Sequence, residues 1–186
     1  MWIVAGLGNP GRRYKKTRHN LGFEVVDLLA KRWALSFKEK DLYEIAKGLY
    51  RQREVVLVKP LTFMNLSGEA IKVVKDFYKI SPQNIIVVHD DLDLPPGRIK
   101  LKKGGSSGGH KGVQSIIDRL SDRGFLRVKL GIGKPEDEPI EGYVLRKPSA
   151  AEAPLIEEAI EKAADAVEEI IVSGIDIAMN IYNKKE

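Results

Sequence analysis

The stretch NIIVVHDD, residues 84–91, decides the fold of this 186-residue chain. Most of it is a continuous run of isoleucine and valine, without the polar alternation of a half-exposed strand. Such a run predicts a strand over 84–89 that is covered on both faces, as in a sheet between two layers of helices. His89, Asp90 and Asp91 follow where this strand ends, and successive residues of a strand point to opposite faces. We therefore expect His89 and Asp91 on one side of the sheet and Asp90 on the other.

The segments around this strand alternate between strand and helix patterns. Strands are predicted over 2–6, 44–50, 54–59, 98–103 and 125–131, and helices over 20–33, from 67, over 111–120 and from 149, with a last short helix after Gly174. Two helices have clear apolar faces, predicted to be Ala70, Val73, Val74 and Phe77, and Ile156, Ile160, Ala163, Val167 and Ile170. Asn20, Ser67 and Ser149 stand where a side chain can cap a helix. The alternation predicts an α/β fold with helices on both faces of the sheet, and the length suits a single domain.

The composition is that of an ordinary globular protein. Hydrophobic residues make up 43% and charged residues 31% of the sequence, and no apolar run is long enough to cross a bilayer. Residues 1–6 have no basic region of the kind that opens a signal peptide. The sequence has no cysteine, which excludes disulfides and cysteine nucleophiles and suits the cytoplasm.

Charge is unevenly distributed along the chain. Residues 150–186 contain three Lys/Arg and nine Asp/Glu, a net charge of −6, whereas residues 1–149 contain 28 and 17, a net charge of +11. A basic body favours a polyanionic partner, with nucleic acid the first candidate. A solvated surface of the kind found in heat-stable proteins explains the same distribution. Charge alone leaves both interpretations open.

The motif GLGNPG, residues 6–11, matches the dinucleotide fingerprint G-x-G-x-x-G. That fingerprint needs a helix to open inside the motif, but Pro10 removes an amide and the following residues have no apolar stripe. A nicotinamide dehydrogenase is therefore the weakest enzyme hypothesis. We interpret the glycines as a sharp turn that directs Asn9 into a cleft. His19, in the polar segment that follows, is one of three histidines and a candidate base near neutral pH.

The cluster HDDLD, residues 89–93, allows two hypotheses. One is a metal-dependent hydrolase in which His89, Asp90 and Asp91 bind the ion, although the spacing matches no strong metal motif. The other, which fits better, is a carboxylate that orients a histidine from elsewhere in the chain. Ser67 has no base partner beside it, so we interpret it as a helix cap and not as a nucleophile.

The stretch GGSSGGHK, residues 104–111, is a glycine–serine loop before a helix. It lacks the Gly-Lys-Ser/Thr of a Walker A loop, and we interpret it as a mobile substrate or anion contact closed by His110 and Lys111. Five cations alternate with apolar residues on or beside two predicted strands: Lys100, Lys102, Lys103, Arg127 and Lys129. The alternation can gather cations on one face for phosphates, or it can belong to a plain solvated face. A non-catalytic RNA-binding module would need only this basic face.

Together these segments resemble the bacterial peptidyl-tRNA hydrolase family. The matching stretches are GLGNPGRRYKKTRHNLGFEVVD, KPLTFMNLSGEA, HDDLDLPPG, KKGGSSGGHKGVQSII and the RVKLGIGKP that precedes GYVL, and they span residues 6–145. Such enzymes hydrolyse the ester that joins a peptide to the 3′ ribose of tRNA. The resemblance implies one α/β domain over 1–186 with a mixed, twisted central sheet. It also implies mobile segments near 104–112 and 134–150 around the cleft, before a C-terminal helical segment over 150–184.

The resemblance implies a role for each site residue. His19 is expected to activate water and Asp90 to orient it, without a cofactor or a metal. The expected substrate contacts are Asn9, Tyr14, Met64, Asn65, His110 and Lys111, although the family often has asparagine at the position of Lys111. Lys100, Lys102 and Lys129 are implied tRNA contacts, and Lys103 and Arg127 are expected to join them. The expected partner is peptidyl-tRNA, and we expect a cytoplasmic monomer without membrane contact that serves translation by recycling tRNA.

Overall fold

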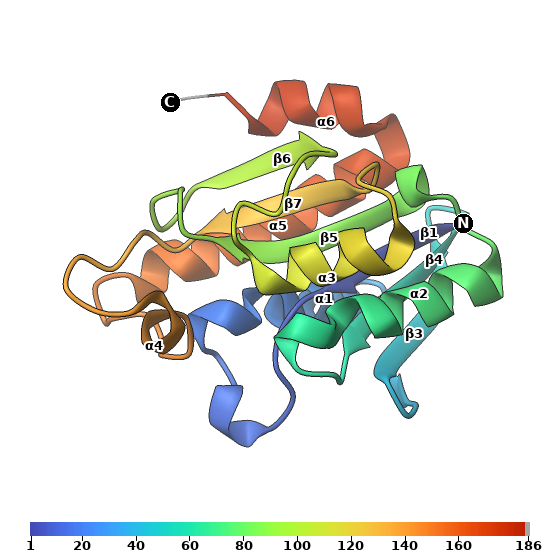
Figure 1. The fold of residues 1–186 in the computed structure, drawn as a ribbon. Helices are drawn as coiled ribbons and strands as arrows, with labels where there is room; N and C mark the ends of the chain where they lie inside the picture. The colour runs from blue at the N-terminus through green and yellow to red at the C-terminus, as the bar shows by residue number, and fades with distance from the viewer. Residues whose placement is uncertain (185–186) are drawn as a thin grey trace.

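The computed structural model describes residues 1–184, which fold around one seven-stranded mixed sheet (Figure 1). The strands are β1 (Trp2–Gly6), β2 (Lys38–Glu39), β3 (Tyr43–Tyr50), β4 (Arg53–Pro60), β5 (Ile85–Asp91), β6 (Ile99–Lys103) and β7 (Leu126–Gly131). Their order is β2-β3-β4-β1-β5-β7-β6. The four central strands β4, β1, β5 and β7 are parallel, and β3 and β6 pair with them antiparallel. The predicted fold class is confirmed.

Two layers of helices cover the sheet. α1 (Leu21–Arg32), α5 (Ala153–Ser173) and α6 (Ile175–Tyr182) pack on one face, and α2 (Ser67–Tyr78) and α3 (Lys111–Leu120) pack on the other (Figure 1). The short α4 (Ile140–Val144) and the 3₁₀ turns η1 (Arg12–Tyr14), η2 (Arg18–Asn20), η3 (Met64–Leu66) and η4 (Pro82–Asn84) complete the elements. Within residues 1–184, no helix combines the length and the apolar character that a membrane span requires.

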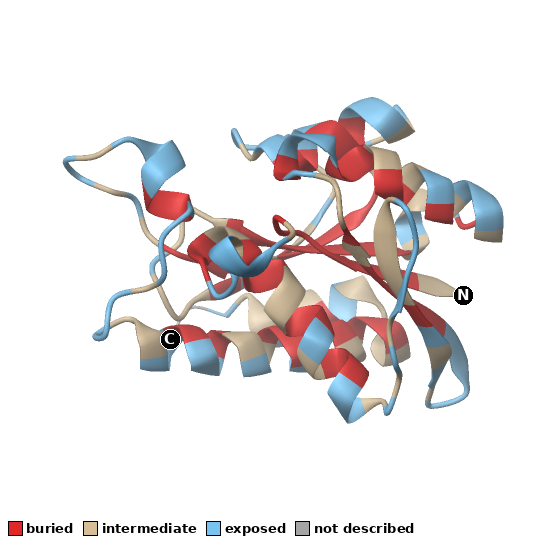
Figure 2. Cartoon of the chain, turned by 90° about the horizontal axis from the view of Figure 1, so that it is seen from below, coloured by how far each residue is buried: buried red, intermediate tan, exposed pale blue. Residues whose placement is uncertain are grey.

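The burial of β5 explains why its sequence lacks polar alternation. Ile85 and Val87 pack with α2 and α3, whereas Ile86 and Val88 pack with α1 and α5. All four side chains have an exposed fraction of 0%, and Figure 2 shows the central strands as buried between the layers of helices. Burying a side chain of this size stabilises a fold by about 1.5–3 kcal/mol. The prediction of a strand covered on both faces is confirmed, and the strand holds both helical layers in place.

The predicted apolar face of α2 is wrong at Val73 and Phe77, which are 44% and 75% exposed. The reason lies at Gly68, where an added Cβ would clash with the backbone carbonyl of Ser115 in α3. Glycine lets the two helices approach this closely. The approach turns the side of α2 that carries Gly68 and Val74 toward α3, so the other two side chains point to solvent.

The three predicted helix caps differ in detail. Asn20 directly precedes α1, but its side chain bonds the backbone of Asn9 instead of a helix N–H group. Ser67 is the first residue of α2 and donates its hydroxyl to the carbonyl of Met64. Ser149 accepts a backbone N–H group three residues further on, and α5 begins after that residue. Side chains therefore hold these turns together, but none of the three caps its helix directly.

Residues 134–150 contain α4, which the sequence did not predict because five residues are too short to show a helical period. Arg18 fastens this segment to η2. Its Nη1 donates to the carbonyl of Tyr143 at 3.0 Å, its guanidinium lies 3.9 Å from the centroid of the Tyr143 ring, and its Nη2 pairs with Glu152 at 3.0 Å. The segment thus packs beside the turn that carries His19. Its mobility, like that of 104–112, stays a prediction.

Asn183 closes the open edge of the sheet at β6. Its Oδ1 accepts the N–H of Leu101 at 2.8 Å, and its Nδ2 donates to the carbonyl of Leu101 at 2.9 Å, as a neighbouring strand would. Asn183→Ala is expected to lower the free energy of unfolding by about 1–3 kcal/mol, because it removes both bonds. Urea unfolding followed by circular dichroism measures the loss. Asn180→Ala, at an exposed position of α6, should change this free energy by less than about 0.5 kcal/mol. Equal losses in the two variants would contradict the edge-closing role.

Candidate active site

A cavity of about 710 Å³ opens near the carboxyl ends of β1 and β5. Most of the predicted site residues line it: Asn9, His19, Met64, Asn65, Asp90, Lys102, His110, Lys111, Arg127 and Lys129. Tyr14, Lys100 and Lys103 lie outside this lining. Open α/β sheets bind ligands at the carboxyl edge of their parallel strands, so the location suits a substrate.

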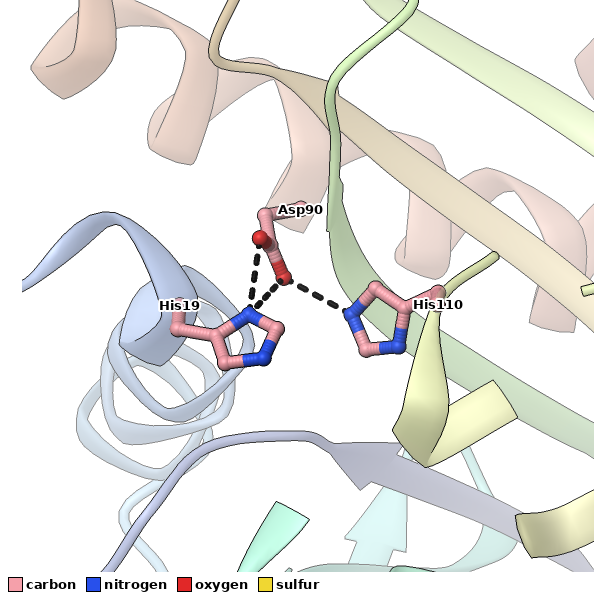
Figure 3. A group of neighbouring side chains, drawn as sticks. All are labelled: His19, Asp90 and His110. Carbon is pink, nitrogen blue, oxygen red and sulfur yellow. Dashed lines mark hydrogen bonds and ion pairs between the residues drawn. The ribbon is translucent and has the colours of Figure 1, made fainter. Parts of the chain in front are cut away.

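His19, Asp90 and His110 form a hydrogen-bonded group in this cavity (Figure 3). Nδ1 of His19 lies 2.9 Å from Oδ2 and 3.0 Å from Oδ1 of Asp90, and Nε2 of His110 lies 2.9 Å from Oδ1. Asp90 is only 2% exposed. Burial by itself would raise the pKa of Asp90, but the two imidazoles lower it well below its usual value. Asp90 is therefore a carboxylate that accepts a hydrogen bond from each histidine.

The N-terminus of α3 fixes which nitrogen of His110 carries a proton. Nδ1 of His110 accepts the backbone N–H groups of Gly112 at 3.1 Å and Val113 at 3.3 Å, in the manner of a helix cap. It therefore carries no proton, and the proton on Nε2 is donated to Asp90. His19 donates its Nδ1 proton to the same carboxylate, which leaves the lone pair on its Nε2. In residues 1–184, no group hydrogen-bonds to that nitrogen.

Two glycines bring the His19 turn against the end of β5. An added Cβ at Gly22 would clash with the carbonyl of Val88, and one at Gly6 would clash with the carbonyl of Gly22. Only without these side chains can α1 lie so close to β1 and β5. The first glycine of the GLGNPG motif thus serves helix packing. The first α-helix begins only at Leu21, which agrees with the argument against dinucleotide binding.

Asn9 presents an amide NH₂ group to the cavity. Its backbone N–H and C=O bond the side chain of Asn20 at 2.8 and 2.9 Å, and its Oδ1 accepts the N–H of Met64 at 2.8 Å. With the oxygen turned to Met64, the Nδ2 group is the free end of the carboxamide. The sequence assigned Asn20 only a capping role. No local pattern pairs it with Asn9, because a side chain that binds a loop eleven residues away leaves no period in the sequence.

Three predicted substrate contacts lie at or beyond the rim. Asn65 and Lys111 are exposed and line the cavity from η3 and from the first turn of α3. Tyr14 packs edge-on against Phe63, with ring centroids 6.4 Å apart, and Phe63 lines the cavity. Tyr14 therefore does not line the cavity itself but packs against Phe63, which does.

Strand register gathers four of the five predicted tRNA-contacting cations on one face: Lys100, Lys102, Arg127 and Lys129. Lys103 points to the opposite face and pairs with Asp176 of α6 at 3.5 Å. Burial and the charges of its three cationic neighbours lower the pKa of Lys102. Like charges placed directly opposite one another destabilise a sheet, so the arrangement suits an anionic ligand.

The structure also tests the metal hypothesis. In the described chain, one group of three possible metal ligands occurs, His19, Asp90 and His110, whose donor atoms lie within 4.8 Å of one another. An ion on Nε2 of His110 would need the ring proton on Nδ1, which already accepts two backbone N–H groups. His89, which the metal hypothesis combines with Asp91, uses Nδ1 for the Asp90 carbonyl at 2.7 Å and Nε2 for a guanidinium at 3.0 Å. These bonds favour an orienting carboxylate over a metal site.

A second hollow of about 610 Å³ adjoins the site, and Asn9 lines both. Glu24 lines this hollow, and burial raises its pKa to about 7, while Lys16 acts in the opposite direction. The folded protein thus holds this proton more tightly than the unfolded chain, whose glutamate pKa is 4.5. The contribution of Glu24 to stability is therefore present below pH 4.5 and is lost as the pH rises through about 7.

Glu24→Gln is accordingly expected to stabilise the protein at pH 8, by about 1–3 kcal/mol, and to leave its stability at pH 4.5 nearly unchanged. Denaturant unfolding at both pH values measures the difference. Glu136→Gln, at an exposed position, is the control and should give the wild-type pH dependence. A Glu24→Gln protein that is no more stable than wild type at pH 8 would refute the prediction.

Comparison with known proteins assigns the chain to a family. Residues 3–186 match the family model described as "Peptidyl-tRNA hydrolase". The peptidyl-tRNA hydrolase of Thermodesulfovibrio yellowstonii is 49% identical over 186 residues, which cover 99% of this chain and 100% of the relative. The peptidyl-tRNA hydrolase of Caldanaerobacter subterraneus subsp. tengcongensis is 48% identical, over 98% of this chain and 100% of that relative. The crystal structure of peptidyl-tRNA hydrolase from Acinetobacter baumannii has a TM-score of 0.95 and 36% identity, covering 100% of this chain and 96% of that chain. With such similarity over its whole length, the chain belongs to the peptidyl-tRNA hydrolase family.

Proposed function

We propose that this protein hydrolyses the ester between a peptide and the 3′ ribose of tRNA, with His19 as general base. The proposal depends on one observation above the others. The Asp90 carboxylate holds His19 in the tautomer that leaves the Nε2 lone pair free, in a cavity at the carboxyl edge of the sheet. An activated ester is a good electrophile, so water and a base suffice and no covalent nucleophile is needed. The reaction makes the protein a carboxylic ester hydrolase that returns tRNA to translation.

In this mechanism Nε2 of His19 takes a proton from the water whose oxygen attacks the ester carbonyl. The bond from the carbonyl carbon to the ribose oxygen then breaks, and the imidazolium returns the proton to that oxygen. Asp90 holds the ring and stabilises its positive charge while the proton is on Nε2. General-base assistance of this kind contributes roughly 10²–10⁴-fold to the rate.

The remaining cavity residues supply contacts that ignore the peptide sequence. The Asn9 amide NH₂ is oriented to donate to the developing oxyanion or to a peptide carbonyl, because Met64 holds its oxygen. Asn65 and Lys111 offer further polar groups, and Met64 adds an apolar wall. We assign Tyr14 to the outer rim, and His110 to the site through its bond with Asp90. Contacts to backbone groups would let any peptidyl chain be cleaved.

Lys100, Lys102 and Lys129 of β6 and β7 are proposed to bind tRNA phosphates beside the cavity. Lys102 and Lys129 line the cavity itself, and Lys100 is exposed next to them on the same face. Phosphate contacts position a nucleic acid without reading its sequence, so tRNAs of every sequence would be accepted.

Ester cleavage by the wild-type protein tests the proposal. Peptidyl-tRNA should be hydrolysed, with free aminoacyl-tRNA as the specificity control. Turnover should survive exhaustive chelation of transition metals in buffer that keeps Mg²⁺ for tRNA folding. Absence of cleavage would favour a non-catalytic RNA-binding module, and loss of cleavage on chelation would restore the metal hypothesis.

Replacing Lys100 and Lys102 with methionine is expected to weaken tRNA binding and flatten its salt dependence. Each lost phosphate contact should reduce the slope of log Kd against log salt concentration by about 0.7–0.9. Binding of deacylated tRNA at several salt concentrations measures the slope. Lys103→Met is the matched variant on the opposite face of β6. A flatter slope for Lys103→Met as well would show that tRNA also contacts the opposite face of β6. An unchanged slope for each of the single variants Lys100→Met, Lys102→Met and Lys103→Met would refute the assignment of these lysines to phosphates.

A further inference from the structure

We propose that Arg127 is a positioning residue that fixes the backbone of Asp90 through His89 and holds the glycine loop through Ser106. The inference rests on the proposed function, because it assigns Arg127 to the alignment of the His19–Asp90 pair. The sequence places Arg127 among the tRNA-contacting cations, but it is the most buried of the four on this face. It is 3% exposed, whereas Lys102 and Lys129 are half-buried and Lys100 is exposed.

Arg127 donates one hydrogen bond to a buried histidine and another to the glycine loop. Nε donates to Nε2 of His89 at 3.0 Å, and Nη1 donates to the carbonyl oxygen of Ser106 at 2.6 Å. No carboxylate within residues 1–184 forms an ion pair with this guanidinium. The planar fork of an arginine suits two acceptors at fixed directions, which the single charge of a lysine does not. The guanidinium therefore joins the loop before α3 to a histidine at the end of β5.

His89 passes this constraint to the catalytic aspartate. Because Nε2 accepts from Arg127, the ring proton is on Nδ1, which donates to the backbone carbonyl of Asp90 at 2.7 Å. His89 is 1% exposed, and burial, His110 and Arg127 lower its pKa well below the usual value. The ring stays neutral and keeps one donor and one acceptor. Asp90 is thus fixed twice, by its carboxylate through His19 and His110 and by its carbonyl through His89.

Arg127 thus connects the glycine loop, residues 104–109, to the end of β5 that carries Asp90. Residues 104–109 hold their place partly through the Ser106 carbonyl, and the same guanidinium sets the end of β5. If Arg127 is removed, the buried Nε2 of His89 and the carbonyl of Ser106 lose a donor, and Asp90 loses a restraint on its backbone. A displacement of the order of 1 Å at a reacting group can cost about 10²-fold in rate.

Arg127→Met, compared with Lys102→Met, tests the role. The two residues are partners in the register of β6 and β7, so the variants remove one charge each from adjacent positions on one face. Arg127→Met should lower kcat for peptidyl-tRNA by about 10–100-fold, with KM and the salt dependence of tRNA binding near those of wild type. Lys102→Met should instead raise KM and flatten the salt dependence, with kcat retained. If Arg127→Met behaves like Lys102→Met, or if its kcat is that of wild type, the proposal is overturned.

A double variant tests whether Arg127 acts on Asp90 through His89. His89→Asn keeps a donor for the Asp90 carbonyl but cannot reach Arg127, and it should lower kcat without changing KM. Combined with Arg127→Met, it should cause no further loss, because both substitutions break one chain of bonds. Losses that multiply would overturn the route through His89. If Arg127→Met fails to fold by circular dichroism, His89→Asn alone decides, and wild-type kcat in it would overturn the proposal. Retained turnover in His19→Ala would show instead that the proposed function has failed.

Discussion

His19→Ala is expected to lower kcat on peptidyl-tRNA by about 10²–10⁴-fold, the contribution of a positioned general base. Its Nε2 is the basic atom that the hydrogen bonds leave free in the cavity, because Nδ1 is committed to Asp90. The cations proposed to contact tRNA belong to β6 and β7, whereas His19 belongs to η2, so binding of deacylated tRNA should be retained. Single-turnover hydrolysis at saturating enzyme, together with the Kd for tRNA, separates the two effects.

His19→Asn is the sharper companion variant. Its side-chain NH₂ can still donate to Asp90 and hold the turn in place, but it has no basic nitrogen. Both variants should therefore be equally slow if basicity is the function of His19. Activity in His19→Asn that approaches wild type would show that the residue acts only by holding the site together. Full activity in His19→Ala would remove the mechanism.

Local patterns predicted most of the fold. The continuous apolar run of β5 reports burial on two faces, and α3 begins and ends at the predicted residues 111 and 120. Hydrophobic periodicity is a property of one segment, so the sequence of that segment is enough to predict the helix or strand that it forms. The exposed side of α2 was wrong because Gly68, and the helix that it lets approach, set the buried face. Which side of α2 is buried therefore depends on the position of α3, and the apolar period of α2 does not show it.

The active site was less accessible to local reasoning. The pairing of His19 with Asp90 came from family resemblance, because 71 residues separate the two and no spacing rule joins them. Their contact depends on β1 lying beside β5 and on α1 lying against both. The two bonds that fix the tautomer of His110 are made by backbone N–H groups, which every sequence has and which therefore leave no signal. Nothing in the sequence indicates that Arg127 is more buried than the lysines on its face, because strand alternation predicts the face of a side chain but not what covers it.

Asp90→Asn is expected to lower kcat by roughly 10³–10⁴-fold, the effect of putting a catalytic histidine into the wrong tautomer. The asparagine has one oxygen and one NH₂ group where the aspartate has two oxygens. His110 must keep donating from Nε2, since its Nδ1 caps α3, so it retains the amide oxygen at the position of Oδ1. The NH₂ group then takes the place of Oδ2, 2.9 Å from Nδ1 of His19, and the one amide oxygen, 3.0 Å from the same nitrogen, is shared with His110. A proton on Nδ1 is repelled by the NH₂ donor and competes with His110 for the oxygen, which favours the tautomer with the proton on Nε2 and weakens the base.

A change of tautomer predicts a partial rescue that a simple loss of negative charge does not. In Asp90→Asn combined with His110→Ala, the amide is free to turn its oxygen toward His19, which restores the proton to Nδ1. The double variant should therefore be faster than Asp90→Asn alone. His110→Ala by itself controls for the lost helix cap, which should cost about 1 kcal/mol of stability. Imidazole ¹⁵N chemical shifts report the tautomer of His19 directly in each protein. An Asp90→Asn protein that is slow while His19 keeps its proton on Nδ1 would assign the loss to the missing charge and contradict the tautomer argument.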